Sequence, residues 1–236
     1  MQSIALPFLS FAAACEALTL GRTILFPTET FYGFGCDAMN PDSVGAVFSI
    51  KKRSLSMPLP VIIGSLDKLS SVVAHVPPLA EKLMAAFWPG PLSIVLPAAP
   101  EVPDLLTANA GRIAVRFSPH PATVELCRGT DKVLVASSAN ISGSPSATRP
   151  ENLEPELVRN SAGIFAIGPE PAGGLPSTVV DVIEGRNTGR IRILRSGAVS
   201  FESLIDAGFS VSDASGAQAP APQGMDKRIS NTGSTG

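Results

Sequence analysis

The sequence is poor in the residues that build metal centres and disulfide frameworks. It holds two histidines and three cysteines in 236 residues. The cysteines, Cys15, Cys36 and Cys127, are odd in number and form no C-x-x-C pair, which predicts reduced packing residues instead of disulfides or a zinc site. His75 and His120 lie far apart in the chain. The sequence therefore offers too few histidines for a histidine-based metal centre and argues against a histidine-dependent catalytic triad. We expect no metal ligands.

Charged residues are also scarce, at 16% of the chain against 44% hydrophobic residues. This balance is typical of a compact globular domain, and the length suffices for one substantial core and a tail. No apolar run approaches the roughly 20 residues that cross a bilayer. The N-terminus also lacks the basic region of a signal peptide. We therefore expect a cytoplasmic protein that makes no membrane contact.

The net charge of the chain is close to neutral, at −2. A protein that grips nucleic acid over its whole surface usually carries a strongly basic charge, so this class is disfavoured. A local basic cleft is still compatible with the composition.

The stretch over residues 23–53 concentrates turn formers, glycines and cations. Residues 23–26 read T-I-L-F, a β-branched and aromatic run that predicts a strand. After the turn P-T-E-T, residues 31–36 resume an extended pattern that contains Gly33 and Gly35. Glycine inside a strand often marks a place where a ligand or another backbone comes close.

A helix is predicted next, capped by Asp42 and ending at Lys51. One face of this helix changes from apolar to basic at its last turn. Lys51 and Arg53 therefore leave the helix end as two cations close to the P-T-E-T turn, an arrangement that binds anions. Taken alone, K-K-R is more often a solvated helix end.

Residues 33–38 also match the dinucleotide fingerprint G-x-G-x-x-A. Asn40 and Pro41 separate these glycines from the helix, and no acidic residue follows where the fingerprint places its ribose partner. The match therefore does not favour a nicotinamide or flavin site.

Two polar segments stand out in the second half of the chain. Residues 112–117 are predicted to form a strand with Arg112 and Arg116 on the same face. Two arginines there are costly in a hydrophobic domain unless they meet anions. A buried strand at 133–136 runs into the Ser/Asn-rich segment 137–146, which suits a phosphate or ribose cradle but taken alone is compatible with an ordinary loop.

The remaining patterns complete a mixed α/β fold around one twisted, mixed sheet. Further helices are expected at 9–20, 65–73, 78–88, 119–127, 151–160 and 200–207, with strands at 60–63, 92–96, 164–167, 178–183 and 190–194 and a loop at 97–110. Residues 210–236 hold too few apolar side chains to order themselves and are predicted to form a disordered tail behind a domain at 1–209.

Five separated segments together resemble the YrdC-like family, the L-threonylcarbamoyladenylate synthases. They are P-T-E-T-F-Y-G-F-G, K-K-R, W-P-G-P-L with A-V-R after it, S-S-A-N-I-S-G, and P-S-T-V-V-D followed by L-R-S-G. They occur in the family's order over roughly residues 9–197. The resemblance implies a YrdC-like single domain in its short form, with a twisted mixed β-sheet, flanking helices and a concave basic cleft.

The resemblance also implies an activity and its partners. L-threonine, bicarbonate and ATP would give threonylcarbamoyl-AMP and pyrophosphate, for threonylcarbamoyl modification of adenosine 37 in tRNA. Because these substrates are anionic, cations and neutral donors suit them, and catalysis would rest on positioning and charge stabilisation. Mg²⁺ would be carried by ATP without a dedicated protein cage. A threonylcarbamoyl transferase would act downstream.

Site residues follow from the same resemblance. The expected catalytic cations are Lys51 and Arg53. The residues expected to bind threonine are Thr30, Arg116, Ala136 and Ser177. The residues expected to bind ATP are Arg53, Arg112, Ser138, Asn140, Ser146 and Arg195.

The chain departs from the family pattern at three positions. Ser54 stands where members usually have proline, Met57 where many have a polar residue, and Ile62 where some have a threonine-contacting histidine. The alternative function is a non-catalytic module of the same fold that binds tRNA or double-stranded RNA. A carbamoyl-transfer relative, as found inside hydrogenase-maturation proteins, is disfavoured because no accessory zinc-type or acylphosphatase-like segment is present.

Overall fold

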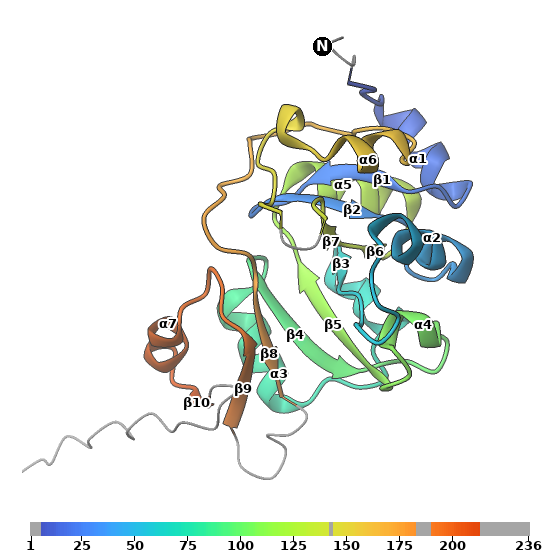
Figure 1. The fold of residues 1–236 in the computed structure, drawn as a ribbon. Coiled ribbons are helices and arrows are strands. Elements are labelled where there is room, and N and C mark those ends of the chain that lie inside the picture. The colour runs from blue at the N-terminus through green and yellow to red at the C-terminus, as the bar shows by residue number, and fades with distance from the viewer. Residues whose placement is uncertain (1–5, 142–143, 183–189, 213–236) are drawn as a thin grey trace, which may run out of the picture.

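The computed structural model describes residues 6–141, 144–182 and 190–212, and Figure 1 shows their arrangement. The helices are α1 (Phe11–Thr19), α2 (Pro41–Lys51), η1 (Leu66–Ser71), α3 (Pro78–Phe87), α4 (Asp104–Thr107), α5 (Pro121–Thr130), η2 (Pro150–Asn152), α6 (Pro155–Arg159) and α7 (Phe201–Asp206), where η marks 3₁₀ turns. The strands are β1 (Ile24–Pro27), β2 (Tyr32–Gly35), β3 (Val61–Ile63), β4 (Leu92–Pro97), β5 (Arg112–Phe117), β6 (Leu134–Val135), β7 (Ser137–Ser138), β8 (Thr178–Asp181), β9 (Arg190–Arg195) and β10 (Ser210–Ser212).

The strands form two sheets. The larger has the order β10-β9-β8-β4-β5-β3-β6 and mixes parallel and antiparallel neighbours. The smaller is antiparallel, with the order β1-β2-β7, and lies above the larger in the view of Figure 1. The predicted α/β class and mixed sheet are confirmed. The expectation of one sheet is wrong, because the chain continues from β6 into a second sheet.

The two sheets meet where the chain passes from β6 to β7 through Ala136. β6 pairs with β3 of the larger sheet, and β7 pairs with β2 of the smaller one. Gly35 in β2 lies so close to β6 that a Cβ atom on it would stand 1.8 Å from the carbonyl oxygen of Val135. The expected close backbone approach at this glycine is thereby confirmed.

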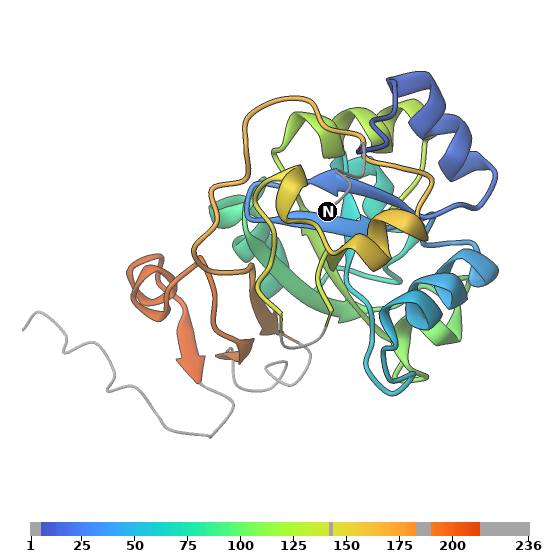
Figure 2. The same cartoon turned by 45° about the horizontal axis from the view of Figure 1, so that its top comes forward.

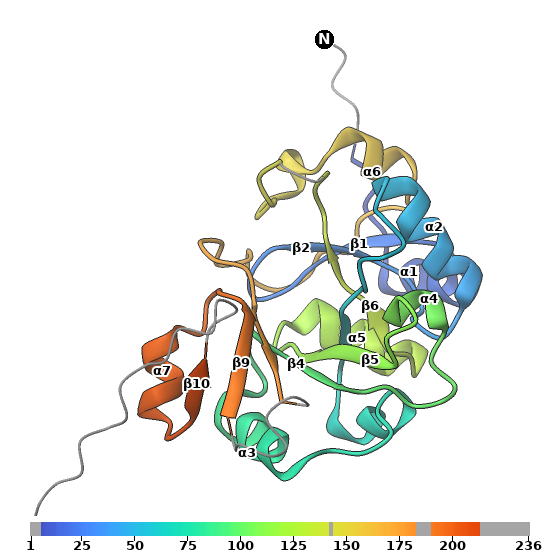
Figure 3. The ribbon, with the colours of Figure 1, turned by 60° about the horizontal axis from the view of Figure 1, so that its bottom comes forward.

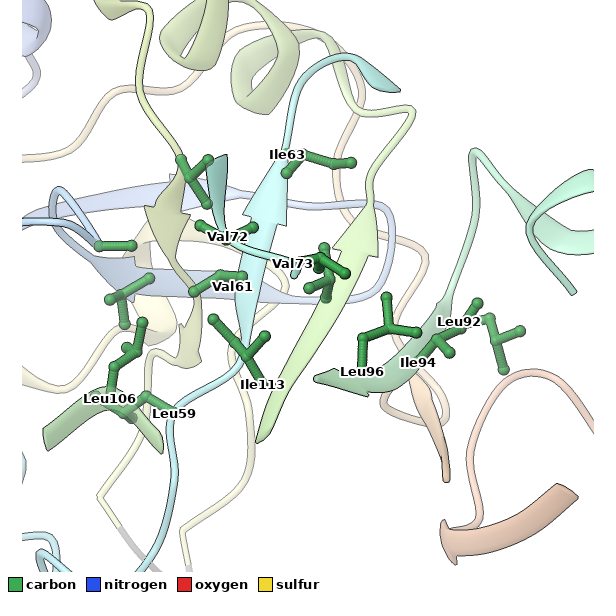
Figure 4. Packing of buried hydrophobic residues seen from close by; sticks show 14 of the residues in the cluster. Leu59, Val61, Ile63, Val72, Val73, Leu92, Ile94, Leu96, Leu106 and Ile113 are labelled. Atoms are coloured by element: carbon green, nitrogen blue, oxygen red, sulfur yellow. The ribbon is translucent and has the colours of Figure 1, made fainter. Parts of the chain in front are cut away.

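The two faces of the larger sheet differ in character, as strand alternation predicts. Ile113 and Val115 of β5 point into the main core, whereas Arg112 and Arg116 belong to the other face. Figure 4 shows how β3, β4 and β5 supply this core together with the segment after η1, through Val61, Ile63, Val72, Val73, Leu92, Ile94, Leu96 and Ile113. The apolar face therefore leaves the opposite, polar face available for a site.

Helices α1 and α5 pack side by side against β1 (Figure 2). Their contact buries a second apolar cluster, which includes Ala14, Leu18, Ile24, Phe26 and Leu126. Ser10 caps α1 by accepting a hydrogen bond from the backbone N–H of Ala13 at 3.2 Å, and Gly21, with φ of 73°, follows the helix. This packing fixes the position of the smaller sheet.

Helix α2 lies beside α4 and ends near the junction of the sheets (Figure 3). Its cap is Asn40, not the predicted Asp42, because the Asn40 side chain accepts from the N–H groups of Asp42 and Ser43 at 3.0 and 3.1 Å. Pro41 occupies the first helical position, which suits proline and makes the preceding residue the cap.

Three predicted elements differ from the observed ones. The helix expected over 151–160 is split into η2 and α6, because Pro155 lacks an N–H and restricts the residue before it. The strand expected over 164–167 is reduced to single backbone bridges. The loop expected over 97–110 contains the short helix α4.

The ordered domain extends beyond the predicted boundary. Residues 210–212, expected to begin a disordered tail, form β10 beside β9, and Val211 is buried in the main core. The physical reason is that the edge of β9 offers backbone partners which composition alone does not reveal. The rest of the predicted tail, 213–236, lies outside the described residues.

Truncation after Phe209 is expected to lower stability, whereas truncation after Ser212 is not. The shorter chain loses the ladder between β10 and β9 and the burial of Val211, which contributes about 2 kcal/mol. In a domain of this size, such a loss lowers the melting temperature by several degrees. Thermal unfolding followed by circular dichroism measures the difference, and equal melting temperatures would show that β10 adds nothing to the folded domain.

Candidate active site

A cavity of about 240 Å³ opens at the junction of the two sheets. It brings together predicted site residues from five separate segments of the chain: Thr30, Arg53, Arg116, Ala136, Ser138, Ser146, Ser177 and Arg195. The convergence of distant segments on one cavity supports the assignment of these residues to a single site. The wider concave basic cleft stays a prediction.

The P-T-E-T turn is held by Thr28. Its hydroxyl donates to the carbonyl of Phe31 at 2.8 Å and accepts from the N–H groups of Thr30 and Phe31 at 3.3 and 3.4 Å. Thr28, and not Thr30, is therefore the side chain that satisfies the backbone of the turn. The Thr30 hydroxyl is left to face Arg116 and the cavity.

Arg116 enters the cavity from the end of β5 and is almost completely buried. Its Nη1 donates to Glu29 Oε1 at 2.6 Å and to Thr30 Oγ1 at 3.3 Å. Its Nε and Nη2 donate to no side chain or backbone group among the described residues. A carboxylate can accept from two such N–H groups in parallel, so this edge of the guanidinium is suited to a carboxylate ligand.

Arg195 comes from the end of β9 and fixes Ser177. Its Nη2 donates to the carbonyl oxygen and the hydroxyl of Ser177 at 2.8 and 2.9 Å, and its Nε donates to the same carbonyl at 3.2 Å. Ser93 of β4 lies 3.2 Å from Ser177, hydroxyl to hydroxyl. The hydroxyl groups of Ser93 and Ser177 thus form one wall of the cavity, and Arg195 sets the position of Ser177.

Arg53 lines the cavity just beyond the end of α2. Its Nη2 donates to the carbonyl of Pro58 at 2.9 Å, and its Nε donates to that of Met57 at 3.3 Å. Met57, one of the departures from the family pattern, thus takes part through its backbone, while its side chain is exposed.

The cavity combines positive charge with partial exclusion of water. Burial lowers the pKa of Arg53. Burial, and then the charges of Arg116 and Arg53, lower the pKa of Arg195. Burial also lowers the pKa of Arg116, although Glu29 opposes this effect. Cations that repel one another in a dry cavity bind anions strongly, because an anion removes the repulsion.

Lys51 lies behind the wall of the cavity instead of on its surface. Its Nζ donates to Ser137 Oγ at 2.7 Å and to the carbonyl of Ser138, and both serines line the cavity. Burial, and then the charge of Arg53, lower the pKa of Lys51 to about 8. The structure therefore shows Lys51 as a link between the K-K-R and S-S-A-N segments, where the sequence predicted a direct catalytic cation.

Besides Lys51, two predicted residues do not reach the cavity. Arg112 shares a face with Arg116 but lies four residues earlier, about 13 Å along the strand, and pairs with the buried Asp181 at 3.0 Å. Asn140 donates from Nδ2 to the carbonyl of Ser144 at 2.6 Å and does not line the cavity.

Ser93 lines the cavity and Glu29 contacts Arg116, and the sequence predicted neither as a site residue. Ser93 alternates with the buried Leu92 and Ile94, so a lone serine inside an apolar strand was an available signal for the polar face. Glu29 pairs with Arg116 across a long sequence separation that no local pattern encodes. Among the described residues, no group of three or more His, Cys, Asp or Glu could hold a metal ion, and no helix is long and apolar enough to cross a membrane.

Comparisons with known proteins find relatives that match most of the chain. The family model Sua5_yciO_yrdC, described as telomere recombination, matches residues 16–197. Threonylcarbamoyl-AMP synthase of Pyrococcus abyssi is 34% identical over 184 residues, which cover 78% of this chain and 53% of that protein. Threonylcarbamoyl-AMP synthase of Xylella fastidiosa is 35% identical over 181 residues, which cover 75% of this chain and 95% of that protein. The chain thus spans about half the length of the archaeal relative.

A solved structure extends the likeness to three dimensions. That of P. abyssi Sua5 complexed with L-threonine matches with a TM-score of 0.78 at 29% identity, over 89% of this chain and 62% of that chain. The described fold is therefore shared with a protein that binds this amino acid.

Replacement of Lys51 by methionine is expected to change how stability depends on pH. The pKa of Lys51 is about 8 in the folded chain, below its reference of 10.5. Between these values the unfolded chain holds the proton and the folded chain does not, so the stability of the wild type rises with pH. Relative to Lys51→Met, it should gain roughly 3 kcal/mol between pH 8 and 10.5.

Urea unfolding at a series of pH values measures this difference. Lys52→Met, which changes an exposed lysine at the next position, is the matched control and should show no such gain. A wild-type advantage that stays constant across the pH range would show that the Lys51 ammonium is not destabilised by its surroundings.

Proposed function

This chain belongs to the Sua5/YciO/YrdC family, and on that basis we propose that it synthesises L-threonylcarbamoyl-AMP from L-threonine, bicarbonate and ATP, with release of pyrophosphate. The product would serve the threonylcarbamoyl modification of adenosine 37 in tRNA. One observation carries the proposal: Arg53, Arg116 and Arg195 converge with neutral hydroxyls on one cavity. That donor set fits a reaction in which each substrate and the leaving group carries a carboxylate, carbonate or phosphate group.

The threonine end of the cavity is proposed to lie at Arg116. Its free Nε and Nη2 edge would hold the carboxylate, while Thr30, Ser177 and the backbone of Ala136 would contact the rest of the amino acid. The L-threonine complex of the structural relative supports threonine as a ligand of this fold.

The nucleotide end is proposed to lie at Arg53 and Arg195, with Ser138 and Ser146 as neutral donors. Negative charge gathers on the α-phosphate and on departing pyrophosphate when the carbamate oxygen attacks. Preorganised cations stabilise such charge without rearranging. The cavity offers hydroxyls and arginines instead of carboxylate ligands, so Mg²⁺ would enter on the phosphates of ATP.

The other predicted contacts are placed less directly. Arg112 and Asn140 lie outside the cavity, so they would contact only a nucleotide that extends beyond it. Lys51 would act through Ser137 and Ser138. Contact with tRNA or double-stranded RNA, a downstream threonylcarbamoyl transferase and a cytoplasmic location stay predictions from the sequence.

The decisive experiment incubates the purified chain with ATP, bicarbonate and labelled L-threonine. Pyrophosphate release that requires both threonine and bicarbonate, together with a labelled adenylate resolved by chromatography, would support the proposal. RNA binding without any threonine-dependent turnover would favour the alternative, a non-catalytic module of the same fold.

Arg116→Ala is expected to act chiefly on threonine. Loss of a charge-assisted, paired contact should cost on the order of 2–4 kcal/mol of threonine affinity and leave ATP affinity nearly unchanged. Calorimetry with each ligand measures both. Arg149→Ala removes an exposed arginine from a surface pair with Glu170 and serves as the control. Equal losses for threonine and ATP would contradict the assignment.

Arg53→Ala is expected to damage the chemical step more than substrate binding. Removal of one preorganised donor commonly costs about 10²–10³ in rate, whereas ATP keeps its contacts to Arg195, Ser138 and Ser146. Steady-state kinetics should therefore show a low kcat with a modest change in the KM for ATP. A normal kcat with a large increase in that KM would assign Arg53 to nucleotide binding alone.

Lys51→Ala should lower kcat in the same way, through displacement of the serine segment.

A further inference from the structure

One carboxylate contacts Arg116 without lining the cavity itself. Glu29 Oε1 accepts from Arg116 Nη1 at 2.6 Å, and Glu29 Oε2 accepts from the hydroxyl of Ser118. The Glu29 side chain is largely buried, at 15% exposed. An acidic group is unexpected beside a site for polyanions, because its charge weakens the attraction for phosphate.

Glu29 is fixed from several sides. Its own carbonyl accepts from the N–H of Ala172 at 3.1 Å, and the carbonyl of Thr30 accepts from Gly173 at 2.9 Å. The Ser118 hydroxyl that donates to Glu29 also accepts from the N–H of His120 at 3.2 Å. Residues 116–118 therefore hold the carboxylate, and residues 172–173 hold the backbone that carries it.

The three arginines of the cavity consequently differ in net charge. Among the described residues, Arg53 and Arg195 donate to neutral groups, which are the carbonyls of residues 57 and 58 and the backbone and hydroxyl of Ser177. Within the same part of the chain, Arg116 is the arginine of the cavity that has a carboxylate partner. The charge of Arg116 is thus compensated, whereas no described carboxylate compensates the charges of Arg53 and Arg195.

An arginine whose charge is compensated and arginines whose charges are not compensated suit different ligands. A zwitterionic amino acid has no net charge, so its carboxylate can use the free edge of Arg116 while its ammonium group meets a field weakened by Glu29. A polyphosphate gains little from a neutralised arginine and is repelled by the nearby carboxylate. The separation of charges therefore sorts the two ligand classes, a form of selection by unfavourable contacts.

We propose that Glu29 is a specificity-determining residue that reserves the Arg116 end of the cavity for a zwitterionic α-amino acid and excludes phosphate groups from it. This inference rests on the proposed function, because it assigns the two ends to threonine and to the triphosphate. Glu29 acts on the ligand through the charge it places on Arg116.

The test measures direct binding of L-threonine and of inorganic pyrophosphate by calorimetry, with no turnover required. In the wild type, pyrophosphate should occupy the end formed by Arg53 and Arg195, and threonine should still bind in its presence. In Glu29→Gln, which keeps the size of the side chain, threonine affinity should fall at least about tenfold. Pyrophosphate should bind at least about tenfold more tightly and should then compete with threonine.

Two further variants separate charge from geometry. Ser118→Ala removes a hydrogen bond from Glu29 but keeps its charge, so pyrophosphate affinity should stay at the wild-type value. Glu170→Gln makes the same chemical change in an exposed glutamate that pairs with Arg149 at 3.1 Å, and it should leave both ligands unaffected.

The outcomes distinguish this inference from the function on which it rests. Equal weakening of both ligands in Glu29→Gln would show a merely structural role and overturn the inference. Unchanged pyrophosphate affinity and no competition would overturn it as well, and threonine-dependent turnover by the wild type would then leave the proposed function intact. Failure of the wild type to bind threonine at all would overturn the proposed function and the inference together.

Discussion

The close contact between two backbones, at Gly35 and Val135, is the constraint on which this architecture depends. A side chain at Gly35 would collide with the Val135 carbonyl, and only its absence lets β2 lie against β6. With that distance set, the chain can leave the larger sheet at Ala136 and pair with β2 as β7. The cavity exists because this passage brings the hydroxyls of the serine segment opposite the arginines of β5 and β9.

The cavity also shows what a binding site costs a fold. Four cations lie in or behind its wall, and partial burial is the largest cause of the lowered pKa of each one. Like charges in a partly dry space destabilise the ligand-free protein. An anionic ligand relieves that strain and stabilises the folded state in proportion to its affinity. The residues proposed to bind the ligand therefore also lower the stability of the ligand-free protein.

Local patterns in the sequence predicted the elements better than their partnerships. Alternation correctly placed Arg112 and Arg116 on one face of β5, because side-chain direction follows from the strand period alone. The same rule does not predict what lies beside each position along the strand. It therefore could not distinguish Arg116, which lines the cavity, from Arg112, which pairs with Asp181. Lys51 was correctly placed at a helix end, but its burial behind two serines depends on a contact between segments far apart in the chain. Composition likewise hid β10, whose order comes from the edge of β9.

The passage from β6 to β7 has a consequence for how the chain acquires its site in time. Gly33 pairs with Ser138, and Leu92 pairs with Thr178, so the walls of the cavity come from segments that are distant in sequence. Closing such long loops is entropically costly and slow, and contacts of this kind delay folding. A fragment would have to span residues 53–195 to hold all three arginines of the cavity. A newly made chain would therefore be unable to bind its substrates until the last long-range strand pairs have formed.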